Sequence, residues 1–492
     1  CIKDNGEGFH AGSMEKLIRF LKGTEYVCGH NILNHDVKYL GNALREAGVR
    51  HCIDTLYLSP LLFPMKPYHA LLKDDKLQSD DINNPFNDAR KAADLFNDEV
   101  AAFLELEPEI KRIYRGLLKD QPEFRSFFRF IGLQDAPFIG LQEVPPSDFR
   151  KCPLIGPGTG IESGLGSGIE SGGVGIESGP GSGSAIRSST GSGEAPGDLV
   201  SAITQKFENL ICGNVDLTAF VLKNPKELAY TLSLIHAKSR YSITPAWVLK
   251  QFPAVENMMH QLGNSPCLSG CAYCNSALDI YKALNRFFGF ENFRTYEGEP
   301  LQERAVRAAV RNESLLVVFP TGGGKSLTFQ LPALISGQNA KGLTVVISPL
   351  QSLMKDQVDN LEKAGIVDAV TINGLLDPIE RAKSIQRVQD GSASILYISP
   401  ESLRSKTIER ILLDRNVVRF VIDEAHCFSA WGHDFRVDYL YIGEFIRELQ
   451  VKKGRAEPIP ISCFTATAKK KVIEDIIAYF KRHLGVKLEL FA

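Results

Sequence analysis

Residues 315–326 read LLVVFPTGGGKS, and this stretch predicts the architecture of the second half of the chain. An apolar run of buried-strand length leads into a glycine-rich turn and a Lys-Ser pair that opens a helix, which is how phosphate-binding loops are built. The glycines let backbone N–H groups approach a polyphosphate, and the helix start favours the same anion. The lysine adds a mobile charge, and the serine hydroxyl can ligate Mg²⁺. The predicted nucleotide and Mg²⁺ site consists of Thr321, Gly322, Gly323, Gly324, Lys325 and Ser326.

Phe319 stands where the strict G-x-x-x-x-G-K-[ST] pattern has its first glycine, so a glycine-rich turn with an exposed lysine is the alternative interpretation. A second motif favours the nucleotide site. Asp423 and Glu424 follow the apolar run VVRFVI. An Asp at a strand end can hold Mg²⁺ through water, and the neighbouring Glu can orient and deprotonate an attacking water. Alone this pair is often a helix cap, but behind a phosphate loop it predicts nucleotide hydrolysis.

Residues 286–492 alternate strand-like and helix-like segments, the pattern of a parallel sheet covered on both faces. The expected strands are LLVVF, GLTVVIS, ASILYIS, VVRFVID and PIPISCFTA. In such sheets ligands lie at the carboxyl ends of the strands, and each motif falls at such an end.

The segments FPTGGGKSLTFQLPAL, VISPLQSLMKDQV, YISPESL, VIDEAHCFSAWGHDFRVDYL and FTATA, in this order, resemble motifs I, Ia, Ib, II and III of RecQ-type superfamily 2 helicases with a DEAH box. The resemblance implies a RecA-like, P-loop lobe of an ATP-dependent 3′–5′ DNA helicase. It makes Lys325 the phosphate lysine, Ser326 and Asp423 the Mg²⁺ residues and Glu424 the catalytic base. His426 is the implied relay to DNA.

The same resemblance implies that Trp431, Phe435 and Arg436 sense single-stranded DNA, and aromatic residues interleaved with Arg suit base stacking. Without the resemblance, the two aromatic residues would more often be core residues. Arg294 and Gln302 match the motif that reads adenine, although the insertion YEGEP separates them here. SPLQSL and TAT offer hydroxyls for phosphate contacts on DNA, while Ser-Pro turns are also common structural elements.

The 492 residues allow about three domains, and the formal net charge of -2 excludes a generally basic nucleic-acid coat. Ten scattered cysteines fit a reducing compartment, and neither a leader nor a membrane-spanning apolar run is apparent. We expect a cytoplasmic, bacterial protein. The chain starts with Cys1 and ends after motif III, so we expect a fragment without the second motor lobe that binds nucleotide weakly and hydrolyses it slowly.

Residues 1–150 are expected to form an α/β unit that ends in helices. Two predicted helix starts carry carboxylates, Asp36 in GHNILNHDVKYL and Asp88 in NPFNDA. Carboxylates from distant segments could share divalent metals for phosphodiester hydrolysis, and the alternative is that both are helix caps.

GHNxxxHDxxYL followed by NPxxDA resembles two motifs of the DnaQ-like, DEDD-type 3′–5′ exonucleases, which have a ribonuclease-H-like fold. The resemblance implies that Asp36 and Asp88 bind the catalytic metals. The first acidic motif would precede Cys1, and Asn83 and Asn84 stand where the two subtypes have His or Tyr. These departures leave exonuclease activity open.

Residues 151–197 are mostly Gly, Ser, Ile, Glu and Pro, with GIESG at 160, 168 and 175, and we expect a flexible linker. Residues 198–285 follow as a small helical domain. Its Cys267, Cys271 and Cys274 have C-x3-C-x2-C spacing, which favours zinc or an iron–sulfur cluster. Cys212 is the best candidate for a fourth ligand and His260 the next. Unligated thiols, or a radical enzyme that uses S-adenosylmethionine, are the alternatives.

The sequence thus predicts an ATP-dependent 3′–5′ DNA helicase of RecQ type that acts in DNA repair or recombination with DNA as its partner, fused to an exonuclease-like domain. One alternative is a DNA-stimulated ATPase that remodels DNA without unwinding it. The other is a non-catalytic module that binds DNA and recruits repair proteins.

Overall fold

The computed structural model contains two compact units. The first comprises Cys1–Tyr57, Leu71–Glu105 and Lys119–Ala195, and the second comprises Leu58–Ala70, Leu106–Leu118 and Pro196–Ala492. The structure describes residues 1–10, 12–66, 69, 85–132, 195–237, 242–267, 270–429, 436–455, 457–466 and 469–492. Most of the predicted linker, Trp431 and Phe435 therefore lie outside the described residues.

In the first unit, two short strands pair in parallel, β1 (Tyr26–Gly29) with β2 (His51–Asp54). Its helices are α1 (Met14–Leu21), α2 (Asp36–Ala47), α4 (Pro85–Glu105) and α6 (Pro122–Phe130). Helix α3 (Thr55–Leu62) follows β2 directly and continues into the second unit. A core formed by Leu17, Leu21, Val27, Ile32 and Leu44 packs α1 and α2 on β1, and the charge of Asp36 at the start of α2 acts on Asp54 at the end of β2.

Among the described residues, seven strands form one parallel sheet in the second unit, in the order β5-β6-β4-β7-β8-β3-β9. Five of them coincide with the expected apolar runs, and VKLELFA also supplies a strand, whereas β5 was not predicted. The strands are β3 (Leu315–Val318), β4 (Leu343–Ile347), β5 (Ala369–Ile372), β6 (Ile395–Ile398), β7 (Val417–Ile422), β8 (Ile461–Thr465) and β9 (Glu489–Phe491).

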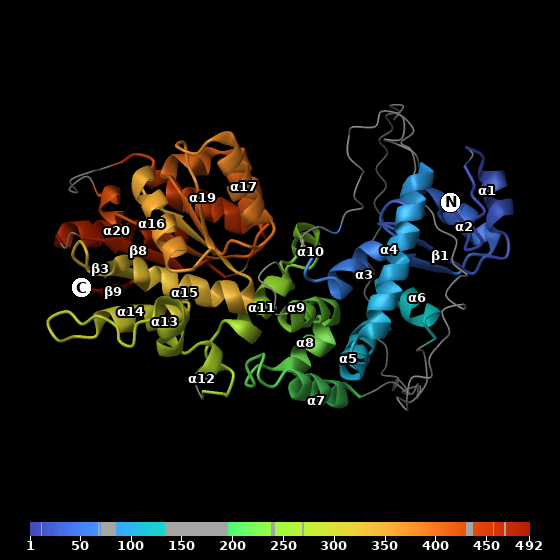
Figure 1. Ribbon diagram of the computed structural model, residues 1–492, viewed down its shortest axis with the longest axis horizontal. Helices are drawn as coiled ribbons and strands as arrows, with labels where there is room; N and C mark the ends of the chain where they lie inside the picture. The colour runs from blue at the N-terminus through green and yellow to red at the C-terminus, as the bar shows by residue number, and fades with distance from the viewer. Residues whose placement is uncertain are drawn as a thin grey trace, which may run out of the picture. The chain divides into compact units, whose positions relative to one another are not determined.

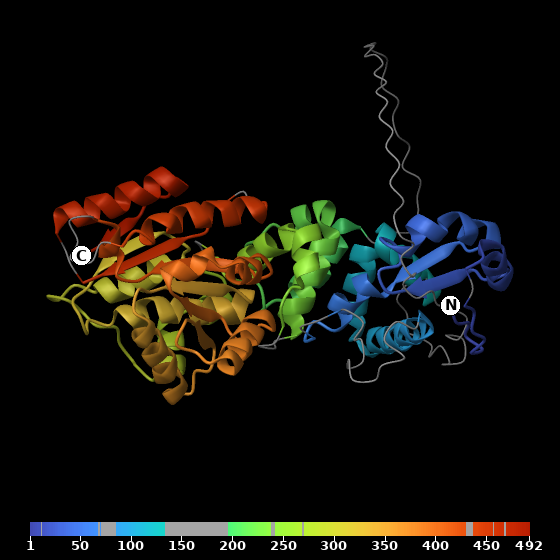
Figure 2. The same cartoon turned by 90° about the horizontal axis from the view of Figure 1, so that it is seen from above.

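Helices cover both faces of this sheet, as the nearly continuous apolar strands require. One core packs α14 (Leu301–Val310), α15 (Lys325–Ala340) and α16 (Gln351–Lys363) on one face. The other core contains residues of α17 (Pro378–Gln389), α18 (Lys406–Leu413), α19 (Tyr439–Lys452) and α20 (Lys470–Leu484). Figure 1 shows strands β3, β8 and β9 between α14 and α20, and Figure 2 shows the unit turned by 90°.

The residues before the sheet in the second unit are helical. They form α5 (Pro108–Leu118), α7 (Pro196–Lys206), α8 (Leu217–Lys223), α9 (Pro225–Ala237), α10 (Ala246–Gln251), α11 (Ala254–Gly263), α12 (Cys274–Ala277) and α13 (Ile280–Phe288). They belong to the same compact unit as the sheet, and a separate domain over 198–285 stays a prediction. None of the helices in the described part of the chain is long and apolar enough to span a bilayer.

Candidate functional site

The glycine-rich loop runs from the end of β3 to the start of α15 and has a backbone that requires glycine. Gly322 and Gly324 have φ angles of +75° and +82°, in the left-handed region that other residues seldom adopt. A Cβ on Gly323 would lie 2.8 Å from the Pro320 carbonyl oxygen, and one on Gly324 would lie 2.6 Å from Gln302 Nε2. The three glycines are therefore fixed by local geometry and by close packing.

Three side chains, from residues just before α14 and at its start, donate hydrogen bonds to the carbonyl groups of this loop and so clamp it. Arg294 Nη1 donates to the Gly322 carbonyl over 2.7 Å, Tyr296 Oη donates to the Gly323 carbonyl, and Gln302 Nε2 donates to the Gly324 carbonyl over 3.0 Å. Because the N–H and C=O of one peptide point in opposite directions, the clamped carbonyls direct the following N–H groups away from the clamp. Convergent backbone N–H groups are what a phosphate requires.

Gln302 was predicted to read adenine together with Arg294, and the structure places both against the loop. Gln302 is 2% exposed, and its Oε1 accepts a hydrogen bond from the Arg294 backbone N–H over 2.8 Å. Adenine recognition by the pair stays a prediction. Sequence reasoning missed Tyr296, whose ring stacks on Phe319 with 4.3 Å between centroids. The only signal was an aromatic residue in the YEGEP insertion.

The predicted phosphate lysine and catalytic base meet at the loop. Lys325 Nζ lies 3.8 Å from Glu424 Oε1, and both side chains are largely shielded, with 14% and 24% exposed. A hydrogen bond with His426 holds the pKa of Glu424 below its ordinary value, and the charge of Lys325 acts in the same direction. Glu424 also has a left-handed φ of +48°, a strained conformation that is common at functional sites.

Asp423 lies deeper at the end of β7. Ser348 Oγ donates to its Oδ2 over 3.3 Å, and the Glu424 backbone N–H donates to its Oδ1 over 3.0 Å. Burial and the adjacent Glu424 charge raise the pKa of Asp423 to about 6. Burial makes the Asp423 carboxylate costly to ionise, and a nearby cation would stabilise its ionised form. A carboxylate oxygen in this position fits Mg²⁺.

His426 connects this pair to the next strand. Its Nδ1 lies 3.2 Å from Glu424 Oε2 and 3.2 Å from Thr465 Oγ1, which is the last residue of β8. Side-chain hydrogen bonds with Cys427 and Glu424 raise the pKa of His426 to about 10. The single Nδ1–H of the protonated imidazole can therefore be shared between the Glu424 carboxylate and the Thr465 hydroxyl oxygen as acceptors.

Strand order explains why these residues come together. Strands β4, β7, β8 and β3 are consecutive in the sheet, and they deliver Ser348, the Asp423–Glu424 pair, Thr465 and the loop to the same edge. The carboxyl edge of a parallel sheet is where ligands bind. Within the loop, Thr321 is exposed and Ser326 is partly buried at the second position of α15, and their roles stay predictions.

Of the three predicted DNA-sensing residues, Arg436 is described. Its Nη1 donates to the Pro349 carbonyl over 3.2 Å, and its backbone N–H donates to the Cys427 carbonyl over 3.2 Å. It therefore joins the segment after the DEAH residues to the SPLQSL segment after β4. Trp431 and Phe435 lie outside the described residues.

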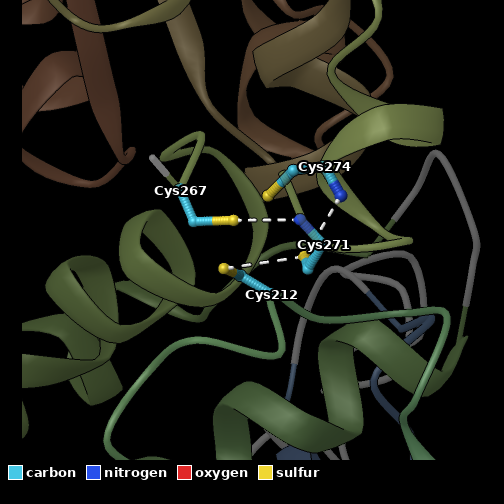
Figure 3. A group of neighbouring side chains, drawn as sticks. All are labelled: Cys212, Cys267, Cys271 and Cys274. Atoms are coloured by element: carbon cyan, nitrogen blue, oxygen red, sulfur yellow. Dashed lines mark hydrogen bonds between the residues drawn. The ribbon is translucent and has the colours of Figure 1, made fainter. Parts of the chain in front are cut away.

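The four predicted cysteines form one group in the described part of the chain. The sulfur atoms of Cys212, Cys267, Cys271 and Cys274 all lie within 4.8 Å of one another, and Figure 3 shows them pointing toward a common centre. Cys212, from a loop more than 50 residues away, is the fourth member of this group and His260 is not in it, and ligation of a metal by these cysteines stays a prediction. Four thiols are a donor set for zinc or iron.

In the first unit, the predicted metal carboxylates lie at helix starts as expected. Asp36 is the first residue of α2 and is 3% exposed, and Asp88 is partly buried in the first turn of α4. Sequence reasoning missed Asp54, which is fully buried at the end of β2. Its carboxylate accepts backbone N–H groups from Asn31, Leu33 and Leu56, and burial raises its pKa to about 6.

Comparisons with known proteins identify the region that contains the loop. Residues 299–476 match the family model described as DEAD/DEAH box helicase. The ATP-dependent DNA helicase RecQ of Bacillus subtilis is 44% identical over 193 residues, which cover 39% of this chain and 30% of that protein. The ATP-dependent DNA helicase Q5 of Rattus norvegicus is 40% identical over 206 residues, covering 40% of this chain and 20% of that protein.

Among solved structures, the DUF1998 helicase MrfA bound to DNA is similar at 22% identity with a TM-score of 0.35, covering 44% of this chain and 30% of that chain. The chain spans less than a third of the length of the two curated relatives named above. It contains a DEAD/DEAH helicase domain with a parallel α/β sheet, whose homologues include RecQ helicases.

Proposed function

We propose that residues 286–492 are the ATP-binding lobe of an ATP-dependent DNA helicase of RecQ type. The observation that carries the proposal is the approach of Lys325 to Glu424 beside the buried Asp423. A phosphate-loop lysine and an acidic pair, at the carboxyl ends of two strands that β8 separates, are the parts that nucleotide hydrolysis needs. The relatives named as ATP-dependent DNA helicases support the same assignment.

In the proposed reaction, Lys325 leaves Glu424 for the β- and γ-phosphates of ATP, while the loop N–H groups bind the phosphate oxygens. Glu424 is then free to orient the attacking water and to accept its proton. Ser326 and Asp423 would hold Mg²⁺, which neutralises charge that develops on the phosphates. Arg294 and Gln302, held against the loop, are proposed to contact the adenine.

We propose that DNA is sensed beyond the DEAH residues. His426 contacts both Glu424 and Thr465, so a displacement of β8 or its following loop would change the environment of the catalytic base. Arg436, Trp431 and Phe435 follow in sequence, and Arg436 is tied to the segment after β4. Contacts of these residues with single-stranded DNA would therefore be transmitted to hydrolysis.

For the whole protein we propose 3′–5′ unwinding of DNA in repair or recombination, by analogy with the relatives. Residues 198–285 are proposed as a helical cysteine domain, 151–197 as a linker, and 1–150 as an exonuclease-like domain in which Asp36 and Asp88 bind metal. Release of nucleotides from a 3′ end by the chain, lost in Asp36→Asn, tests the exonuclease part. Equal release by both proteins would reject it.

The decisive experiment is titration of the chain with a fluorescent ATP analogue and Mg²⁺. Lys325→Ala should lose saturable binding, whereas Lys383→Ala, an exposed lysine of α17, should bind like the unchanged chain. Circular dichroism checks that each protein is folded. Equal binding by the two variants would contradict the proposal and would favour the alternative of a non-catalytic DNA-binding module.

A strand-separation assay distinguishes the remaining alternative. A tailed DNA duplex that stimulates hydrolysis without being separated by the whole protein would favour a DNA-stimulated remodelling ATPase. Separation that depends on Lys325 would favour the helicase.

A further inference from the structure

We propose that Cys212, Cys267, Cys271 and Cys274 bind a single Zn²⁺ ion, and that this ion fastens the cysteine-bearing segments to α15, the helix that starts at the phosphate-loop lysine. The zinc assignment is independent of the proposed function. The expected effect of the ion on nucleotide binding rests on the proposed function.

The spacing of the sulfur atoms selects one ion over an iron–sulfur cluster. In a tetrahedral zinc site with Zn–S bonds of about 2.3 Å, neighbouring sulfur atoms are about 3.8 Å apart. The four sulfur atoms here lie within 4.8 Å of one another, with 4.0 Å between Cys212 and Cys271. A cubane cluster places each thiolate on a different iron, so its thiolates must stand farther apart than ligands of one ion.

Hydrogen bonds to sulfur support ligation by thiolates. The backbone N–H groups of Cys271 and Cys274 donate to Cys267 Sγ and Cys271 Sγ over 3.2 and 3.5 Å. The Asn214 side-chain amide donates to Cys267 Sγ over 3.1 Å. Such donors orient metal ligands and offset their negative charge. Gly270, directly before Cys271, has a φ of +66°, and its backbone N–H donates to the Cys267 carbonyl over 3.4 Å.

The four ligands come from two segments that are far apart in the sequence. Cys212 lies in the loop after α7, and its backbone N–H donates to the Leu262 carbonyl near the end of α11 over 2.7 Å. The other three ligands follow α11 directly. One ion that bonds both segments would close this loop, since a metal site formed on folding stabilises the fold that brings its ligands together.

The cysteine group packs directly on the nucleotide-binding lobe. Cys212 and Cys274 share a buried cluster with Leu331 and Ile335 of α15 and with residues of α13 and α14. Asn339 Nδ2, at the end of α15, donates to the Ala277 carbonyl just after the last cysteine over 3.1 Å. Loss of the ion would therefore loosen the support of the helix whose first residue is Lys325.

The test measures metal in the complete 492-residue chain, produced with zinc and iron both supplied and purified without a metal-affinity tag. Elemental analysis should give about one zinc per chain and negligible iron. Cys271→Ser should lose the zinc, and Cys52→Ser, a partly buried cysteine of β2 in the other unit, should keep it. Iron with sulfide and visible absorption, disulfide-bonded cysteines without metal, or zinc retained by Cys271→Ser would each overturn the site.

A second measurement does not depend on the folding of a variant. Mercurial titration of the four thiols in the unchanged chain, followed with a zinc-binding dye, should release one zinc. Once excess dithiothreitol has removed the mercurial and a chelator has removed the zinc, the metal-free chain should bind the ATP analogue several-fold more weakly, with recovery when zinc is restored. Unchanged affinity after zinc release would overturn the fastening role. A zinc-loaded chain that never binds the analogue would overturn the proposed function and the fastening role while supporting the zinc site.

Discussion

The ammonium group of Lys325 lies 3.8 Å from the carboxylate of Glu424, across the carboxyl edge of the sheet. Each residue thereby offsets the charge of the other at a site where both are shielded from solvent. A nucleotide that attracts the lysine would expose the carboxylate to a water molecule, so the ion pair couples phosphate binding to the readiness of the proposed base.

Glu424→Gln is expected to retain nucleotide binding and to lower the hydrolysis rate by about 10²–10⁴-fold, the typical contribution of general base catalysis. The amide keeps the shape of the side chain but cannot accept the proton. Phosphate release and analogue titration measure the two effects. Glu444→Gln, an exposed residue of α19, is the control, and equal loss of hydrolysis in both variants would refute the role of Glu424.

Nucleotide binding that depends on Mg²⁺ should weaken as the pH falls below about 6, because the pKa of Asp423 is raised to about 6. Without a cation, the folded chain is more stable with Asp423 protonated than with Asp423 ionised. This contribution to the free energy of unfolding is lost as the pH rises through about 6. Mg²⁺ favours the ionised carboxylate and competes with the proton.

Titration of the analogue at a series of pH values, with and without Mg²⁺, measures this effect. Asp423→Asn has no titrating carboxyl group at this position, so its Mg²⁺-dependent binding should be weak at every pH. A variant with the same pH profile as the unchanged chain would assign the transition to another group.

Tyr296→Phe should weaken analogue binding about 5-fold, which corresponds to a net hydrogen bond of about 1 kcal/mol. The change removes the hydroxyl that donates to the Gly323 carbonyl but keeps the ring that stacks on Phe319. Tyr281→Phe, which removes an exposed hydroxyl bonded to Glu303, is the matched control and should bind normally. Normal binding by Tyr296→Phe would show that the loop does not need this clamp.

Arg419→Met should destabilise the second unit by about 2–4 kcal/mol, because buried acceptors lose charged donors. Arg419 is 4% exposed, and its guanidinium donates to the carbonyls of Ala309 and Glu313 and to Ser462 Oγ. Urea unfolding of the two proteins gives the difference. Arg410→Met, on the exposed side of α18, should stay within about 0.5 kcal/mol, and a similarly small change for Arg419→Met would contradict the prediction.

The phosphate loop, the Asp423–Glu424 pair and most of the parallel strands were determined by the sequence alone, because each depends on local rules. Gly322 and Gly324 provide the positive φ angles that the turn needs, and apolar runs of strand length are typical of a sheet buried on both faces. Strand β5 (Ala369–Ile372) was not predicted because Thr371 interrupts its apolar run, whereas the equally short β3 and β6 are continuous apolar runs.

Only the tertiary structure decided which distant side chains meet. Tyr296 reaches the loop, Ser348 reaches Asp423, and of the two candidates left by the sequence it is Cys212 that joins the cysteines more than 50 residues further along the chain. Neither spacing nor periodicity encodes these contacts, because they depend on the order of strands in the sheet and on how helices pack over it. The sequence determined the types of residue needed for nucleotide and metal binding, and the packing decided their partners.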